Sequence, residues 1–248
     1  MWQCFRKNKC GVTGNIFTLL RYLRVNPDDV PIHAVDYIDF KIRDVFDYGS
    51  RVHELKYLPA FSKRIYKHPY IDSRVELDYD RVEVIDAKSY EDYVIFPIRM
   101  DGTLVGWCGR NVSGKETKRK YYNCRGMLNT LFGYDELTST AILVEGIFDR
   151  LKILPYLPKG VSCVSTLGCH VTPTQITHLV RAGVCKVYFW HERDVKSFNG
   201  TFKRLCNYFT CFVGDFIDDD PGELSREEFG KRFSKSMSAE DYSLRVCV

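Results

Sequence analysis

Several features that would place this 248-residue sequence in a common protein class are absent from it. No window approaches the roughly 18 uncharged apolar residues of a membrane-spanning helix. The N-terminal segment MWQCFRKNKC has no apolar core of the kind found in signal peptides. A P-loop of the form GxxxxGK[ST], an internal repeat and a low-complexity tract are missing as well. We therefore expect a cytoplasmic protein with no membrane anchor and no ATPase motor of its own.

A disulfide framework is also absent, although the sequence holds ten cysteines. They are scattered along the chain, and several lie inside apolar runs such as GVCKVYF. Free cysteine behaves as a small buried hydrophobe, so a reducing compartment explains this usage.

Neither sign of charge dominates the composition. There are 36 lysines and arginines against 32 aspartates and glutamates, which gives a formal net charge of +4. This mild excess permits a nucleic-acid partner without requiring one. The length and the hydrophobic fraction of 45% suffice for one large domain or two modest ones.

The first half of the sequence changes character twice. Apolar residues recur at helical spacing in NIFTLLRYLR and predict a helix that ends near residue 25. Residues 26–90 are rich in Tyr, Asp and Arg and are interrupted by prolines, which indicates short helices and turns. From Tyr93 onward, YVIFPI and LVGWCGR flank the turn signal MDGT and predict a β-hairpin.

The second half alternates between apolar strands and helices. The predicted strands are AILV, GVSCVSTLG, CKVYFW and CFVGDFI. Predicted helices follow the first three: IFDRLKILPYL, TPTQITHLVRAG with Thr172 as its N-cap, and NGTFKRLCNYF. This order is typical of βαβ units, so we expect an α/β fold with a largely parallel sheet.

Acidic residues follow three of these strands. Glu145 comes directly after AILV, Glu192 and Asp194 follow CKVYFW, and the run from Asp218 to Asp220 follows CFVGDFI. In open α/β sheets, ligands bind at the carboxyl ends of the strands. Carboxylates gathered there repel one another unless a hard cation such as Mg²⁺ lies among them. The alternative is that each acid is a solvated loop residue or a first-turn helix residue stabilised by the helix dipole.

Four segments of this half form an ordered set of motifs. They are LVEGIFD at residues 143–149, STLG followed by TPTQITHL, VYFWHERDVKSFNG and IDDDPGEL. Upstream of them, VIFPIRMDGTLVGWCGR is followed by KRKYYN. In this order the motifs resemble those of bacterial- and phage-type DNA primases with a TOPRIM catalytic core. The resemblance covers about residues 60 to 235; it departs from the usual Asp-x-Asp motif at Glu192.

The resemblance implies an α+β fold overall, in which a TOPRIM-type parallel sheet flanked by helices follows a smaller basic α+β subdomain. The expected parts are a partial zinc ribbon with a helix at residues 1–25, the basic subdomain at 26–135, the catalytic domain at 136–235 and a C-terminal tail at 236–248.

The implied function is synthesis of short RNA primers on a single-stranded DNA template from ribonucleoside triphosphates. The expected catalytic residues are Glu145, Asp149, Glu192 and Asp194. The expected ligands of Mg²⁺ or Mn²⁺ are Glu145, Glu192, Asp194, Asp218 and Asp220. Glu145 acts as a metal ligand or a general base, with Asp149 in support behind it, and His191 is expected to be structural.

Basic residues cluster between Arg99 and Arg125. This stretch contains seven basic residues and two acids, with tyrosines among them. Basic side chains neutralise phosphates, and aromatic faces stack on unpaired bases. The expected nucleic-acid or nucleotide contacts are Arg99, Arg110, Lys118, Arg119, Lys120, Tyr121 and Arg125. The alternative is a solvated basic loop.

The segment WQCFRKNKCGVTGNIFTLLRYL resembles the second half of the zinc ribbon at the front of these primases. Structural zinc takes four ligands, usually in two close pairs. This N-terminal segment contains only two cysteines, Cys4 and Cys10, which form at most a partial site. We therefore expect no firmly bound zinc.

Two other functions remain open. One is a TOPRIM nuclease that uses the same carboxylates, and the other is a non-catalytic protein, derived from a primase, that binds single-stranded nucleic acid. A phage or mobile-element origin is expected, in a bacterial cell or an infected host, with the replicative helicase on a separate chain.

Overall fold

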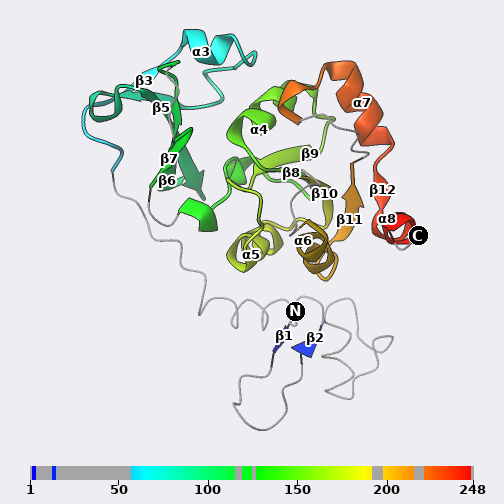
Figure 1. Cartoon of the computed structure of the whole chain (residues 1–248). Helices are drawn as coiled ribbons and strands as arrows, with labels where there is room; N and C mark the ends of the chain where they lie inside the picture. The colour runs from blue at the N-terminus through cyan, green and yellow to red at the C-terminus, as the bar shows by residue number, and fades with distance from the viewer. Residues whose placement is uncertain are drawn as a thin grey trace.

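The computed structural model describes residues 2–3, 13–14, 57–114, 119–124, 127–191, 198–214 and 221–246. These residues form a mixed α+β fold with two five-stranded sheets (Figure 1). Near the N-terminus, β1 (Trp2–Gln3) pairs antiparallel with β2 (Thr13–Gly14). The helix predicted before residue 25, and the partial zinc site at Cys4 and Cys10, lie outside the described residues.

The first large sheet is an antiparallel meander in the order β3-β4-β5-β6-β7. Its strands are β3 (Ser62–Ile65), β4 (Val84–Ala87), β5 (Tyr93–Met100), β6 (Thr103–Asn111) and β7 (Tyr121–Asn123). The predicted hairpin is confirmed as β5 and β6. Its turn residues Asp101 and Gly102 have φ values of 52° and 72°, and two-residue hairpin turns of type I′ need two such positive values.

Residues 26–90 were expected to hold only short helices and turns, and this is wrong for two described segments. Helix α3 (Pro69–Asp72) and the 3₁₀ turn η2 (Lys88–Tyr90) fit the expectation. The segments Ser62–Ile65 and Val84–Ala87 are instead strands, paired along their whole length. Four-residue strands are too short to show a clear alternation of apolar and polar residues, so pairing decides their conformation: β4 pairs with β5, and β3 pairs with β4.

The second sheet has the order β12-β11-β10-β8-β9. The strands β8 (Thr140–Val144), β9 (Val161–Ser165), β10 (Lys186–Trp190) and β11 (Thr210–Val213) are all parallel to their neighbours. The predicted parallel sheet is thus confirmed. The segment 236–248, expected as a tail, adds to it: β12 (Met237–Ser238) pairs antiparallel with β11, and α8 (Ala239–Val246) follows.

Helices cover both faces of the parallel sheet (Figure 1). α5 (Pro173–Arg181) and α6 (Phe198–Leu205) lie on one face, and α4 (Ile147–Ile153) and α7 (Arg226–Ser234) lie on the other. The predicted N-cap of α5 is confirmed, because the hydroxyl of Thr172 accepts from the backbone N–H of Gln175 at 3.2 Å. The 3₁₀ turns are η3 (Met127–Asn129), η4 (Tyr134–Glu136), η5 (Leu154–Tyr156) and η6 (Pro221–Glu223).

The two sheets share one hydrophobic core. The buried side chains of β5 pack against α4, where the rings of Phe96 and Phe148 meet edge to face with centroids 5.9 Å apart. A pair of 3.0 Å backbone hydrogen bonds joins Phe132, from the segment between the sheets, to Ser165 at the end of β9. Within the described residues, no helix is long and apolar enough to cross a bilayer.

Candidate active site at the carboxyl edge of the parallel sheet

The strands that precede the acidic groups end side by side. β8, β10 and β11 are parallel neighbours, so Glu145, His191 and Gly214, which directly follow them, lie along one edge of the sheet. The sequence predicted a largely parallel sheet, and the structure adds that these three strands are neighbours in it. The predicted site residues Glu192, Asp194, Asp218 and Asp220 come next in the chain after His191 and Gly214, and they lie outside the described residues.

Glu145 is held in place through its backbone. Its carbonyl oxygen accepts a 2.8 Å hydrogen bond from the hydroxyl of Ser165 and a 3.2 Å bond from the N–H of Gly168. Its side chain retains 21% of its exposure, so the carboxylate is reached by solvent although it stands at the end of a buried strand. A fixed carboxylate at the edge of a sheet is suited to binding a cation or receiving a proton.

His191 lies beside this carboxylate but is buried. Its Nε2 is 3.2 Å from the hydroxyl oxygen of Thr166, and its Nδ1 is 3.4 Å from the carbonyl oxygen of Cys169. Burial lowers the pKa of His191 to about 3, so the ring is neutral at physiological pH. The 3.7 Å separation between Nδ1 and Glu145 Oε1 is therefore not an ion pair. The geometry fits the expected structural role, in which His191 fills the end of β10.

Asp149 stabilises the turn that leads from Glu145 into α4. Its Oδ2 accepts a 2.7 Å hydrogen bond from the backbone N–H of Gly146. A Cβ at Gly146 would come within 2.8 Å of the same oxygen, so a larger residue there would push the Asp149 carboxylate out of this hydrogen bond. The carboxylate of Asp149 thus contacts the backbone directly behind Glu145, the supporting place expected for it.

The loop after β9 forms one wall of this edge, and Leu167 has a φ of 62° there, a conformation that non-glycine residues rarely adopt. Buried Gln175 holds the loop, because its Nε2 donates to the carbonyl oxygens of Thr166 at 2.7 Å and Thr130 at 2.8 Å. Thr166 and Gln175 were not predicted from the sequence as site residues. The STLG motif and the Thr-x-x-Gln capping pattern were the available signals.

A metal would need ligands from beyond the described part of this edge. Glu145 supplies a carboxylate of the type that Mg²⁺ prefers, and Mg²⁺ keeps several waters when it binds few protein groups. Within the described residues, no group of three or more His, Cys, Asp or Glu side chains could hold a metal ion. The donor chemistry of Glu145 fits Mg²⁺, and the other predicted ligands, Glu192, Asp194, Asp218 and Asp220, lie outside the described residues.

The predicted basic contacts fall into different environments. Arg99 is exposed and pairs with Glu83 at 3.1 Å, whereas Arg110 is only 8% exposed and donates from Nε to the hydroxyl of Tyr70 at 3.0 Å. The guanidinium of Arg110 also lies 4.9 Å from the ring centre of Tyr121 and 5.6 Å from that of Phe148 in α4. Arg110 and Tyr121 therefore help to pack the two sheets together.

The remaining predicted contacts are Arg119 and Lys120, which are exposed beside β7, and Lys118 and Arg125, which lie outside the described residues. A phosphate could reach Arg119 and Lys120 without any rearrangement of the core.

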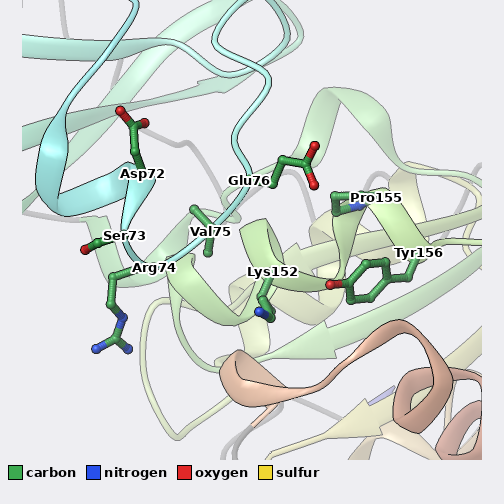
Figure 2. A pocket seen from close by; sticks show the side chains of 8 residues that line it. All are labelled: Asp72, Ser73, Arg74, Val75, Glu76, Lys152, Pro155 and Tyr156. Atoms are coloured by element: carbon green, nitrogen blue, oxygen red, sulfur yellow. The ribbon is translucent and has the colours of Figure 1, made fainter.

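A polar pocket of about 220 Å³ lies at the other end of α4 (Figure 2). Residues 72–76 form one side, and Lys152, Pro155 and Tyr156 form the other. Asp72 and Arg74 point in opposite directions from their segment in Figure 2. Because Glu145 precedes the first turn of α4 and this pocket adjoins its last turn, the two places are separate.

No family model and no curated protein sequence matches this sequence. Solved structures similar to it include two primase domains. A DNA primase domain from Pseudomonas aeruginosa matches with 22% identity and a TM-score of 0.48, over 62% of this chain and 54% of that one. The RNA polymerase domain of Mycobacterium tuberculosis primase DnaG, solved in complex with double-stranded DNA, matches with 16% identity and a TM-score of 0.50, over 62% and 56%.

The matched region spans little more than half the length of each of these structures. At 16% identity the likeness to the mycobacterial domain concerns the fold alone. The α+β architecture expected from the sequence is thereby found in a known primase domain.

Proposed function

We propose that the protein is a primase-type nucleotidyltransferase that makes short RNA primers on single-stranded DNA in a Mg²⁺-dependent reaction. The observation that carries the proposal is the order of strands, in which β8, β10 and β11 are parallel neighbours and each leads into a segment that holds acidic residues. The shared fold and the basic segment beside β7 agree with it. The TOPRIM assignment of the parallel sheet is part of this proposal.

In the proposed reaction, the 3′-hydroxyl of one ribonucleotide attacks the α-phosphate of the next, and pyrophosphate leaves. Mg²⁺ or Mn²⁺, when bound by Glu145, Glu192, Asp194 and the acids at 218–220, supplies positive charge for the triphosphate. Of these predicted ligands, Glu145 lies within the part of the chain that the structure describes. The hydrogen bonds of its backbone carbonyl hold the residue at the sheet edge. Asp149 acts as a positioning residue, because its oxygen is engaged with the N–H of Gly146.

The test is incorporation of radiolabelled ATP and GTP on single-stranded phage DNA with Mg²⁺. Wild type is compared with Glu145→Gln and Asp194→Ala, and Glu240→Gln, at an exposed carboxylate in the first turn of α8, is the matched control. Loss of a carboxylate ligand costs several kcal/mol of charge stabilisation, so we expect at least about 100-fold less product from both site variants. Unchanged synthesis by Glu145→Gln, or no product from folded wild type, would overturn the proposal.

Two further measurements on the same protein and DNA distinguish the alternative functions. A metal-dependent cut in a labelled strand without added nucleotides would indicate a nuclease that uses these carboxylates. Tight binding of single-stranded DNA with neither cutting nor synthesis would indicate a binding protein derived from a primase. The helicase partner and the weak zinc binding expected from Cys4 and Cys10 stay predictions, and zinc at about one equivalent per chain would contradict the latter.

A further inference from the structure

We propose a second contact for single-stranded nucleic acid, on the face of the antiparallel sheet that is turned away from α4. There, Tyr90, Tyr93 and Tyr122 line a pocket that stacks on an unpaired base. This proposal shares with the proposed function only the single-stranded partner. It involves neither the sheet edge at Glu145 nor any step of synthesis.

The alternation of side chains along β6 and β7 creates this second face. Arg110 and Tyr121 are cross-strand partners that point toward Phe148 of α4. Residues at the alternate positions of the two strands point the other way: Trp107 of β6 belongs to a separate small core with Ile85, Ala87 and Ile95, and Tyr122 of β7 packs against it. The outer face therefore has a hydrophobic base of its own, and the tyrosines cover it.

The aromatic side chains on this face hold one another in fixed orientations. The rings of Trp107 and Tyr122 are stacked with an interplanar angle of 9° and a centroid separation of 5.9 Å. Tyr90 lies 5.1 Å from Tyr122, and the hydroxyl of Tyr93 donates to the carbonyl oxygen of Arg119 at 3.1 Å. Side chains that are already ordered lose little conformational entropy when a ligand stacks on them.

The pocket beside these rings has a volume of about 480 Å³, within the range of roughly 300–1,000 Å³ that is usual for small-ligand sites. Its lining consists of the three tyrosines, Ser89, two cations and two acids. The two cations are Lys88 and Arg119, and the two acids are Glu91 and Asp92; all four side chains are exposed. The pocket is therefore aromatic and nearly neutral.

The near-neutral charge of the pocket and its aromatic lining indicate which kind of ligand fits it. A duplex is held mainly through its phosphates, and two cations offset by two acids provide little net attraction for them. An unpaired base presents a π-face to an aromatic ring whatever its identity. Lys88 and Arg119 can each contact a phosphate next to such a base. Single-stranded nucleic acid is accordingly the occupant that matches both the rings and the charges.

The tyrosines could instead serve only to cover Trp107 and the small core around it. In that case, their substitution would change stability and leave binding unaltered. The two roles are separated by Tyr122→Leu, which keeps an apolar cover over Trp107 but removes the stacking ring. Tyr66→Leu is the matched control, because Tyr66 is 60% exposed and does not line the pocket.

Binding is measured by the fluorescence anisotropy of a labelled oligothymidylate of roughly 16 nucleotides, the upper end of a single-domain site size. EDTA is present and nucleotides are absent, so the result does not depend on the metal site. We expect Tyr122→Leu to weaken binding roughly 5- to 150-fold, the range for loss of one stacked base, and Tyr66→Leu to bind as wild type. The factor should be the same at about 50 and 200 mM salt, because stacking releases no counterions.

The position of the strand is tested by ultraviolet cross-linking to an oligonucleotide that carries 5-iodouracil. We expect the cross-linked peptide to contain Tyr90 or Tyr122. Wild-type affinity of folded Tyr122→Leu, or cross-links confined to other peptides, would overturn the proposal. A cross-link here without primer synthesis would refute the proposed function and leave this site standing, and synthesis without the cross-link would do the reverse.

Discussion

A buried charge links three parts of the structure, and its removal tests how the two sheets are joined. Arg150 of α4 is 1% exposed and forms an ion pair with Glu136 of η4, which also pairs with Arg81 from the antiparallel-sheet region. Arg150 Nε donates to the carbonyl oxygen of Cys163 in β9 at 2.9 Å, and its guanidinium lies 5.1 Å from the ring centre of Phe132.

We predict that Glu136→Gln lowers the free energy of unfolding by about 2–3 kcal/mol, because the variant leaves the charge of Arg150 buried without its counter-ion. Loss of one partner of a fully buried pair costs ~3–5 kcal/mol. The smaller value applies because the side chain of Glu136 is 33% exposed, so water can partly replace its carboxylate.

Arg150→Met tests the same pair from the other side. Glu136 keeps Arg81 and its contact with water, so we expect this variant to lose about 1–2 kcal/mol, mostly from the unpaired carbonyl of Cys163. The double variant should then be more stable than the sum of the single losses predicts, by at least about 1 kcal/mol.

Urea denaturation of the four proteins measures this double-mutant cycle. The exposed pair Arg99 and Glu83 is the control, with an expected coupling below about 1 kcal/mol. The pKa of Glu136 predicts independently how the stability contributed by this pair changes with pH. Burial raises the pKa of Glu136, but the positive charges of Arg150 and Arg81 together lower it by more. The net result is a pKa below the ordinary value of a glutamate. The pair's contribution is therefore present at neutral pH and lost in acid. Additive single losses would refute the reasoning.

Three further predictions concern stability and the wall of the site. Burial lowers the pKa of His178 to about 4, so below the unfolded value of ~6.5 only the unfolded chain takes up the proton. Stability should fall by about 2 kcal/mol per such histidine from pH 7 to pH 5, and His178→Phe should reduce this slope in denaturation curves. Gly133 has a φ of 94°, and a Cβ there would overlap the guanidinium of Arg150. Gly133→Ala should therefore cost at least about 2 kcal/mol in the same assay, and a neutral result would contradict the packing described. Gln175→Leu leaves two buried carbonyls unpaired, so a loss of about 2–4 kcal/mol in thermal unfolding is expected, together with weaker primer synthesis if the loop at Thr166 shapes the site.

Local signals in the sequence were sufficient for the hairpin of β5 and β6, for the parallel strands β8 to β11 and for the helices α4, α5 and α6. The Asp-Gly turn between β5 and β6 specifies its own backbone angles, and the Thr172–Gln175 capping box marks the start of α5 within four residues. The missed helix α7 carries the same kind of signal, because Ser225 and Glu228 form a capping box. These features depend on neighbours in the chain, so they can be read without a structure.

The site was only partly predictable. The sequence placed Glu145 at the end of a strand and Asp149 behind it, and the structure places both there. The sequence could not give the neutral state of His191, which results from burial among Thr166 and Cys169, two residues more than 20 positions away. It also suggested Arg110 as a nucleic-acid contact, which stays a prediction, and it could not show that the guanidinium lies between aromatic rings at the junction of the sheets.

The sequence by itself determined the order of strands and helices from β8 to β11, the hairpin turn before them, the N-cap of α5, and the positions of acids after apolar strands. Tertiary structure alone decided the strands β3 and β4, the addition of β12 to the parallel sheet, and the two different faces of β6. The physical reason is the distance along the chain between the residues that interact. Turn and cap energies arise between residues a few positions apart, whereas strand pairing, burial of a charge and the stacking of Trp107 on Tyr122 arise between residues that only the folded chain brings together.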